Sequence, residues 1–247
     1  MIARRADWGQ AIAKAEPLDE ATRAALALAW LEDARMEHAS IASFARLTLH
    51  LLSLGAPPEL VADAQRASLD EIEHARACFA LASRYSGEPV GPGPVAIEGS
   101  LTAVDLADAA VSAVREGCVG ETMAAALAAE QLSVTEDGEA RSALARIVRD
   151  EEAHAELSWR FVRWAIEAGG EPVRAAVARA FSDHLTLERR ETAIVTETVD
   201  VNAWHRHGRL TRAEIDRVTR AVRREVIAPC AQALLGLAAP PEERAIA

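Results

Sequence analysis

Two short segments of the sequence carry the same pattern of acidic and histidine residues. They are Asp70-Glu71-Ile72-Glu73-His74 and Asp150-Glu151-Glu152-Ala153-His154. In a helix, side chains three residues apart project from one face about 5 to 6 Å apart. Glu71 with His74, and Glu151 with His154, therefore each provide half of a metal site. One Glu-x-x-His is weak evidence, but two copies in apolar, alanine-rich surroundings predict a single paired site.

Two further glutamates lie on the apolar stripes of predicted helices. Glu37 precedes Glu71 by 34 residues, and Glu121 precedes Glu151 by 30 residues, so the two halves of this region repeat. Glu37 shares its stripe with Phe44, which favours a ligand over an exposed helical glutamate. The alternatives to Glu121 are Glu116 and Glu130, and both fit the inner stripe less well. We therefore predict Glu37 and Glu121 as ligands.

Four carboxylates and two imidazoles form a ligand set of hard and borderline donors. This set suits iron or manganese better than a metal that prefers thiolates. Its total charge of −4 would neutralise two divalent ions. Because burying an unpaired carboxylate costs several kcal/mol or more, a metal or bound protons must compensate the charge.

Helices must position these residues, because apolar side chains recur at helical spacing and aromatic residues make up only 4% of the chain. The sequence predicts an all-α protein. The predicted helices cover 7–16, 19–55, 58–86, 102–135, 139–168 and 211–237, and one or two further helices lie within 172–201. A capping box at Thr102-x-x-Asp105 begins the fourth helix, and Pro229 is expected to kink the last one. Between them we expect a long Gly/Pro-rich connection at 86–100, a break at 204–208 and a frayed tail at 238–247.

Composition narrows the class of protein. Hydrophobic residues make up 50% of the 247 residues, which is ample for a core. The three cysteines form no C-x-x-C pair, which argues against a disulfide framework and against a rubredoxin or zinc-ribbon module. Without a signal peptide or a long apolar run, we expect a cytoplasmic protein with no membrane span. A net charge of −11 without a basic patch predicts no nucleic-acid partner.

The order and spacing of Glu37, Glu71-x-x-His74, Glu121 and Glu151-x-x-His154 resemble the ferritin-like di-iron carboxylate superfamily, over residues 20 to 168. The resemblance implies a ferritin-like four-helix bundle at 18–170 with a long crossover connection, and a helical C-terminal appendage at 171–247. It also implies that Glu71, with Glu121 or Glu151, bridges two metals. Asp150 is expected to support His74, and Asp70 to support His154.

The same resemblance implies a reaction. Ferritin's own iron-oxidising centre lacks the second Glu-x-x-His, and the rubredoxin-type domain typical of rubrerythrins is absent here. We therefore expect a non-haem di-iron oxidase or oxygenase with two Fe ions, or a Mn/Fe pair, that activates O2 to oxidise a small or carrier-bound substrate with an external electron donor. The alternatives are a rubrerythrin-like peroxide reductase or ferroxidase, and a non-catalytic metal-binding or scaffold bundle. The appendage covers a bundle end, lines a pocket or forms a homodimer interface.

Other reactive side chains receive simpler interpretations. Cys78 and Cys118 lie close to predicted ligands, and we expect them to be small apolar fillers, with a thiol lining the substrate pocket as the alternative. Tyr85 follows His74 by 11 residues, about 16 Å along a helix, which is too far for a metal-coupled tyrosyl radical. The remaining histidines are not predicted to be ligands.

Overall fold

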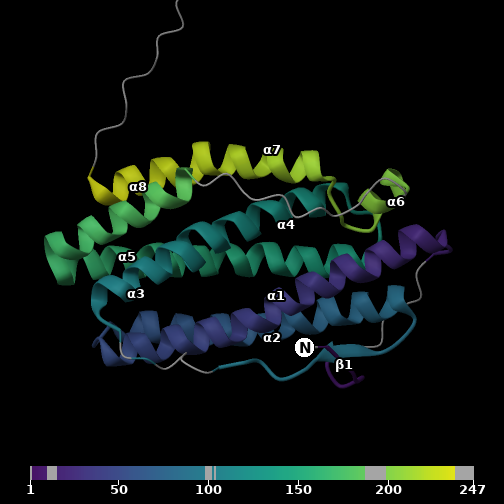
Figure 1. The fold of residues 1–247 in the computed structure, drawn as a ribbon, viewed down its shortest axis with the longest axis horizontal. Coiled ribbons are helices and arrows are strands. Elements are labelled where there is room, and N and C mark those ends of the chain that lie inside the picture. The colour runs from purple at the N-terminus through teal and green to yellow at the C-terminus, as the bar shows by residue number, and fades with distance from the viewer. Residues whose placement is uncertain (1, 10–15, 98–101, 103, 187–198, 237–247) are drawn as a thin grey trace, which may run out of the picture.

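The computed structural model describes residues 2–9, 16–97, 102, 104–186 and 199–236. This part of the chain is almost entirely helical, which confirms the predicted all-α class (Figure 1). Its helical segments are α1 (Glu20–Ser53), α2 (Pro58–Ser86), α3 (Leu106–Ala113), the π-helix η1 (Val114–Glu121), α4 (Thr122–Val134), α5 (Gly138–Thr186), α6 (Val201–Arg206), α7 (Arg212–Val222), the π-helix η2 (Arg223–Ile227) and α8 (Ala228–Leu235). Two short strands, β1 (Ile2–Arg4) and β2 (Val90–Pro92), complete it.

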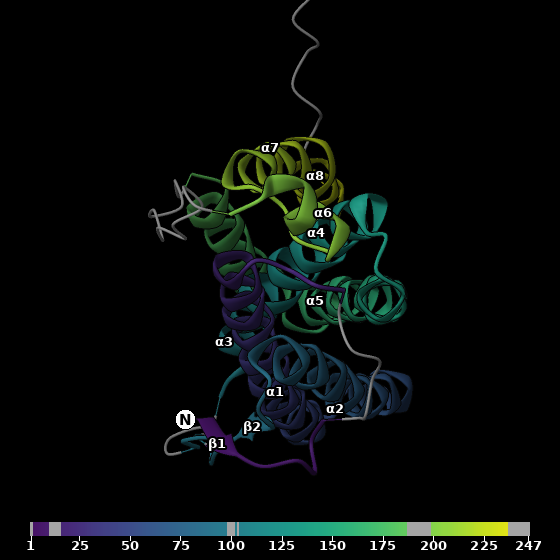
Figure 2. The ribbon, with the colours of Figure 1, turned by 90° about the vertical axis from the view of Figure 1, so that its right-hand side faces the viewer.

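The long helices lie side by side along the longest axis of the molecule (Figure 1). Helix α1 packs along α2, and the continuous run α3, η1 and α4 packs along α5. The two halves meet through α2 and α5, whereas α1 and η1 make little direct contact. In the end view, α7 and α8 lie on the side of the molecule away from α2 (Figure 2). In the described ranges, no helix is both long enough and apolar enough to cross a bilayer.

The ends of α1 and α2 follow from local sequence signals. The Asp19 side chain accepts a hydrogen bond from the Thr22 backbone N–H at 2.9 Å and so caps α1. Pro58 begins α2, where its missing N–H costs nothing, and Gly87 ends α2 with a φ of +78°. The predicted helix over 58–86 is therefore confirmed at both ends.

The third helical run differs from the prediction in its start and in its interior. Asp105, rather than Thr102, caps the helix, because its carboxylate accepts a hydrogen bond from the Asp108 N–H at 2.8 Å. The predicted uninterrupted α-helix over 102–135 is also wrong, because Val114–Glu121 forms a π-helix. π-Turns are rare and occur often at functional sites. This one ends at the predicted ligand Glu121.

Helix α5 continues beyond the end that the sequence indicates. The backbone breaks at Gly170, with φ +64° and ψ −147°, and the helix then resumes through Pro172 to Thr186. Only glycine readily adopts this conformation. The predicted stop at Gly169-Gly170 is therefore a kink, and the segment after it belongs to the same long helical element.

The N-terminal helix predicted over 7–16 is wrong for the residues that the structure describes. Residues 5–9 and 16 are not helical, and 10–15 lie outside the described ranges. Instead, β1 pairs antiparallel with β2, and Ala3 lies opposite Gly91. The Gly/Pro-rich connection thus contributes a strand to a two-stranded sheet, and β1 lies near the bottom of the view in Figure 1.

The C-terminal segments pack on the long helices. Helix α6 contacts α1 and α4, α7 contacts α4, and α8 contacts α5. The break predicted at 204–208 is misplaced, because α6 includes Trp204 and ends at Arg206, and Gly208 (φ +82°) makes the turn. The capping box of Thr211 and Glu214 is present at the start of α7. π-Helix η2 ends just before the predicted kink at Pro229. The tail at 238–247 lies outside the described residues.

Two apolar clusters occupy opposite ends of the long helices. On α1, Ala34 belongs to one cluster and Phe44 to the other, with Glu37 between them. On α2, the same change occurs between Ala67 and Ala75. The predicted ligands therefore form a polar layer between two apolar cores.

Candidate metal centre

The structure brings the predicted ligand residues from four helical segments to one place. Two groups have ligand atoms that all lie within 4.8 Å of one another. They are Glu37, Glu71, His74 and Glu151, and Glu71, Glu121, Glu151 and His154. Glu71 and Glu151 belong to both groups. Each group offers carboxylate and imidazole atoms that could hold a metal ion.

The centre is buried. Glu71 and His74 are 0% exposed, and Glu151 and His154 are 2% exposed. The Glu37 side chain retains 16% exposure. Charged groups at this depth require compensation by opposite charges or a metal.

Each histidine is oriented by an aspartate from the other half of the molecule. His74 Nε2 lies 3.1 Å from Asp150 Oδ2, and His154 Nε2 lies 3.4 Å from Asp70 Oδ2. This is the crossed pairing that the resemblance to the di-iron carboxylate superfamily implies. Because a carboxylate only accepts hydrogen bonds, each Nε2 carries the proton that it donates. In a neutral ring, the Nδ1 lone pair then faces the glutamates and is available to a metal.

The inward atoms are close to one another without being hydrogen bonded. His74 Nδ1 lies 3.5 Å from Glu37 Oε2, and His154 Nδ1 lies 3.1 Å from Glu71 Oε1. Buried atoms without a hydrogen-bond partner include both Glu71 oxygens, Glu151 Oε2 and both histidine Nδ1 atoms. Buried polar atoms are normally satisfied. Their convergence on one point is the pattern of a ligand set, so the residues present fit a metal.

The four glutamates differ in their tendency to bind a proton. Burial raises the pKa of Glu37 to about 8. Burial, helped by the nearby Glu151 carboxylate, also raises the pKa of Glu121 well above its usual range. For Glu71 and Glu151, burial acts in the same direction, but contacts with the histidines outweigh it and lower the pKa of both groups. Glu37 and Glu121 therefore hold a proton more readily than Glu71 and Glu151 do.

The histidines complete the charge balance. Burial acts to lower the pKa of each ring, but the surrounding carboxylates outweigh it. The pKa of His154 is raised to about 10, and that of His74 is also raised. Two cationic rings and two carboxylates cancel, so protons can neutralise the centre when a metal does not. Metal and protons thus compete for the same atoms.

Close packing positions Glu121. A Cβ added at Gly117 would lie 1.9 Å from Ser158 Oγ and 2.4 Å from Ser158 Cβ. Only glycine lets η1 approach α5 this closely. The extra residue in the π-turn also changes the direction in which the Glu121 side chain projects from the helix. Periodicity in the sequence found the stripe with Glu121 but contained no signal for the π-turn.

The competing acidic residues lie elsewhere. Glu116 is exposed and pairs with Arg46 of α1, and Glu130 pairs with Arg217 of α7 at 2.5 Å. Cys78 and Cys118 are buried in opposite apolar clusters, and burial raises the pKa of both thiols. Their packing supports the interpretation as apolar fillers.

The structure contains a second polar network that no pattern in the sequence indicated. The Tyr85 hydroxyl lies 2.9 Å from His207 Nδ1, and Arg84 pairs with Asp137 at 2.8 Å. These residues join α2, the start of α5 and the turn after α6. The i, i+2 spacing of His205 and His207 gave no reason to connect either with Tyr85. The network ties the C-terminal segment to the long helices.

Comparisons of the chain with protein-family models, with curated proteins and with solved structures found no match. The fold and the site by themselves define the class: this is an all-α protein with a buried cluster of carboxylates and histidines that could hold a metal ion.

Proposed function

We propose that this protein is a ferritin-like, non-haem di-iron carboxylate oxidase or oxygenase that activates O2 to oxidise a substrate. The observation that carries the proposal is the pair of overlapping ligand groups that share Glu71 and Glu151. In the superfamily that the sequence resembles, one glutamate comes from each of two helices and Glu-x-x-His comes from each of the other two. The arrangement of the long helices supports the same assignment.

Each side chain has a role in this proposal. Glu37 and His74 would hold one iron, Glu121 and His154 would hold the other, and the two shared glutamates would contact both. When bound, the iron pair supplies the redox chemistry with O2. Asp70 and Asp150 hold the histidine rings in the tautomer that leaves Nδ1 for the metal. A manganese and iron pair would suit the same donors.

Apolar residues surround much of the centre, and a pocket reaches it beside Glu121. Phe44 covers His154, with ring centroids 4.9 Å apart, and the apolar clusters close both ends of the polar layer. Glu121, however, also lines a pocket that opens between α1 and the η1 run. A purely structural metal site is closed by its ligands, whereas a catalytic site needs an accessible position. The pocket favours a catalytic role over a scaffold.

A rubrerythrin-like peroxide reductase or ferroxidase is the second candidate, because it would use the same ligands. Titration of the metal-free protein with Fe(II) without oxygen, followed by rapid mixing with O2, separates these possibilities. We expect two irons per chain by elemental analysis and a transient visible absorption band after mixing. Rapid oxidation by hydrogen peroxide but not by O2 would favour the peroxide reductase. Tight metal binding with no reaction towards either oxidant would leave a structural role.

A further inference from the structure

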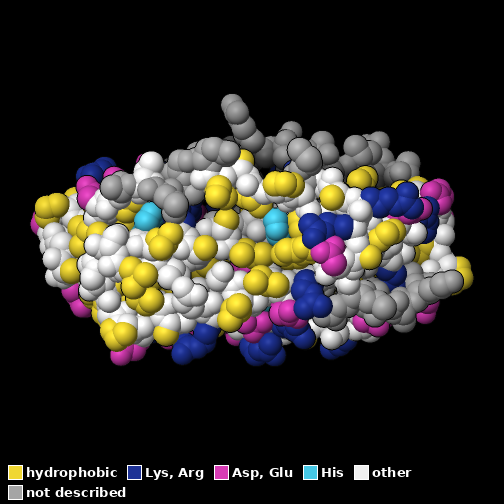
Figure 3. All heavy atoms as spheres, turned by 90° about the horizontal axis from the view of Figure 1, so that it is seen from below, with side chains coloured by type: hydrophobic (Ala, Val, Ile, Leu, Met, Phe, Trp, Pro, Cys, Tyr) yellow, Lys and Arg dark blue, Asp and Glu magenta, His cyan; other side chains and the backbone are white. Residues whose placement is uncertain are grey.

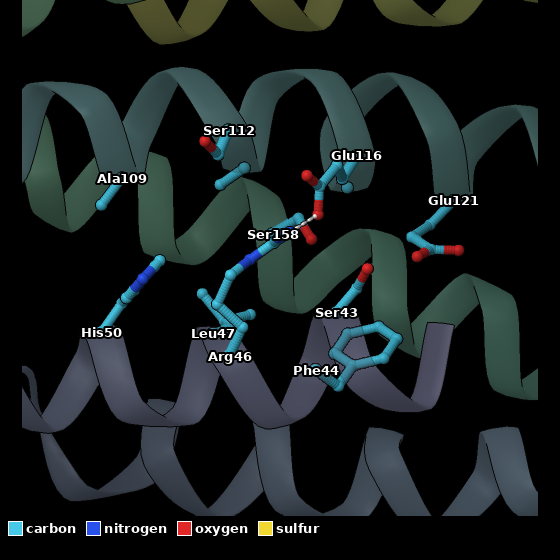
Figure 4. A pocket seen from close by; sticks show the side chains of 12 residues that line it. Ser43, Phe44, Arg46, Leu47, His50, Ala109, Ser112, Glu116, Glu121 and Ser158 are labelled. Atoms are coloured by element: carbon cyan, nitrogen blue, oxygen red, sulfur yellow. Dashed lines mark hydrogen bonds and ion pairs between the residues drawn. The ribbon is translucent and has the colours of Figure 1, made fainter. Parts of the chain in front are cut away.

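The pocket beside Glu121 has an apolar interior and a polar mouth. Its inner wall comes from Phe44 and Leu47 of α1, from Ala109 and Ala113 of α3, and from Glu121 itself. Figure 4 shows Phe44 and Leu47 on α1 across the space from Ala109 and Glu121 on the α3 and η1 run. Because Phe44 also contacts the His154 ring, a molecule in this pocket would lie next to the metal centre.

The charges at the mouth are already paired with each other. Arg46 of α1 and Glu116 of η1 form an ion pair across the opening (Figure 4). Arg46 is therefore not free to neutralise an anionic ligand, and Glu116 is not free to neutralise a cation. With two divalent metals, the ligand glutamates are neutralised as well. His50 also lines the pocket, with its Nε2 buried and without a hydrogen-bond partner, and burial lowers the pKa of its ring. A charged ligand would therefore lose its hydration here and meet neutral polar groups, which is unfavourable.

The enclosed space is small. The cavity measures about 40 Å³. Since roughly 10–15 Å³ of such space holds one water molecule, it accommodates about three waters, or an organic molecule of a few non-hydrogen atoms. A long acyl chain is too large to be enclosed by this space.

We propose that this pocket binds the substrate and that the substrate is a small, uncharged organic molecule with an apolar body. It enters between α1 and η1, past the pair of Arg46 and Glu116. The proposal rests on the proposed function of the metal centre and deepens it, because it selects a small substrate over one bound to a carrier.

Three probes of equal length test the charge preference: 1-propanol, propionate and propylammonium. The readout is the NMR shift of the Leu47 methyl groups in the intact chain, in the metal-free form and in a Zn(II)-loaded form. We expect 1-propanol to give a saturable shift and to bind at least ten-fold more tightly than either ion. Equal or tighter binding of an ion would overturn the proposal. So would a response of Leu47 to dissolved xenon but not to 1-propanol, because the pocket would then admit only gases.

A matched pair of variants tests the location. Ser43 projects into the pocket from α1, so Ser43→Leu should fill it and weaken 1-propanol binding at least ten-fold (Figure 4). Ala77→Leu fills a different surface hollow, between α2 and α5, and should leave binding unchanged. Equal effects of the two variants would contradict the proposed location. Failure of iron binding alongside intact 1-propanol binding would refute the metal function and not the pocket.

Discussion

At the scale of single residues, the glutamates are not equivalent. Glu71 belongs to both ligand groups, whereas Glu37 belongs to one. We expect Glu71→Ala to abolish stoichiometric binding of both metals, and Glu37→Ala to leave one metal per chain. Elemental analysis of the purified, iron-loaded variants measures this difference.

The control for these variants is Glu73→Ala. Glu73 lies in the same motif but pairs with Arg76 and Arg146 at the surface. This variant should keep two metals. If Glu71→Ala also kept two metals, the assignment of the centre would be wrong.

The protonation of the ligands predicts how metal affinity depends on pH. A residue must lose its proton before it binds a metal. Because the pKa of Glu37 is raised to about 8 and that of His154 to about 10, protons occupy these ligands at neutral pH. Affinity should therefore increase as the pH rises from 6 to 9, and metal binding at pH 7 should release protons.

Calorimetric titration in buffers of different ionisation enthalpy counts the protons released. As a control, circular dichroism of the metal-free protein at each pH verifies that the protein stays folded. An affinity that is flat between pH 6 and 9, with no proton release, would show that the ligands are already ionised without metal.

At the scale of secondary-structure elements, η1 must lie against α5 for Glu121 to reach the centre. Gly117→Ala would place a Cβ within 1.9 Å of Ser158 Oγ, so η1 has to move. Overpacking of this kind costs about 1–3 kcal/mol. We expect a lower free energy of unfolding in urea and weaker binding of the metal that Glu121 would hold.

Gly120 provides the matched control for Gly117. A Cβ at Gly120 meets only the Arg115 carbonyl oxygen, at 3.4 Å. Gly120→Ala should be neutral or slightly stabilising, because alanine favours helix more than glycine does. If both variants lowered the free energy of unfolding equally, the loss would come from the π-helix backbone and not from contact with Ser158.

At the scale of the whole molecule, buried polar contacts attach the C-terminal segment to the long helices. Arg209 stacks over Trp30, with its guanidinium carbon 4.8 Å from the ring centroid, and pairs with Asp33 of α1. We expect Arg209→Ala to lower the free energy of unfolding by about 3 kcal/mol, because it leaves a carboxylate without its partner and removes packing.

Urea unfolding followed by circular dichroism measures this loss. Arg217→Ala removes an exposed ion pair with Glu130 and should cost less than about 1 kcal/mol. Two separate transitions in the wild-type protein would show that residues 171–247 form an independent unit. A single transition would show that the segment folds with the bundle.

The surface is consistent with the acidic composition of the chain. On the face seen from below, many hydrophobic side chains are exposed, and Arg side chains lie close to Asp and Glu (Figure 3). Exposed large hydrophobic residues include Leu28, Met36 and Leu69. The expectation that no nucleic acid binds this protein stays a prediction.

Local sequence determined the helices and the composition of the centre. Helical periodicity placed Glu71, His74, Glu151 and His154 on buried stripes, because the geometry of an α-helix repeats every 3.6 residues whatever surrounds it. Caps such as Asp19 and stops such as Gly87 act within one turn and were equally readable. A local pattern could therefore predict which residues form the candidate site.

Only the tertiary structure decided how these residues meet. The sharing of Glu71 and Glu151 depends on the relative positions of four helical segments, and so does the close approach of Gly117 to Ser158. The pairing of β1 with β2 and that of Tyr85 with His207 join segments far apart in the chain. None of these features leaves a local pattern, because each is set by packing between residues that are distant in sequence.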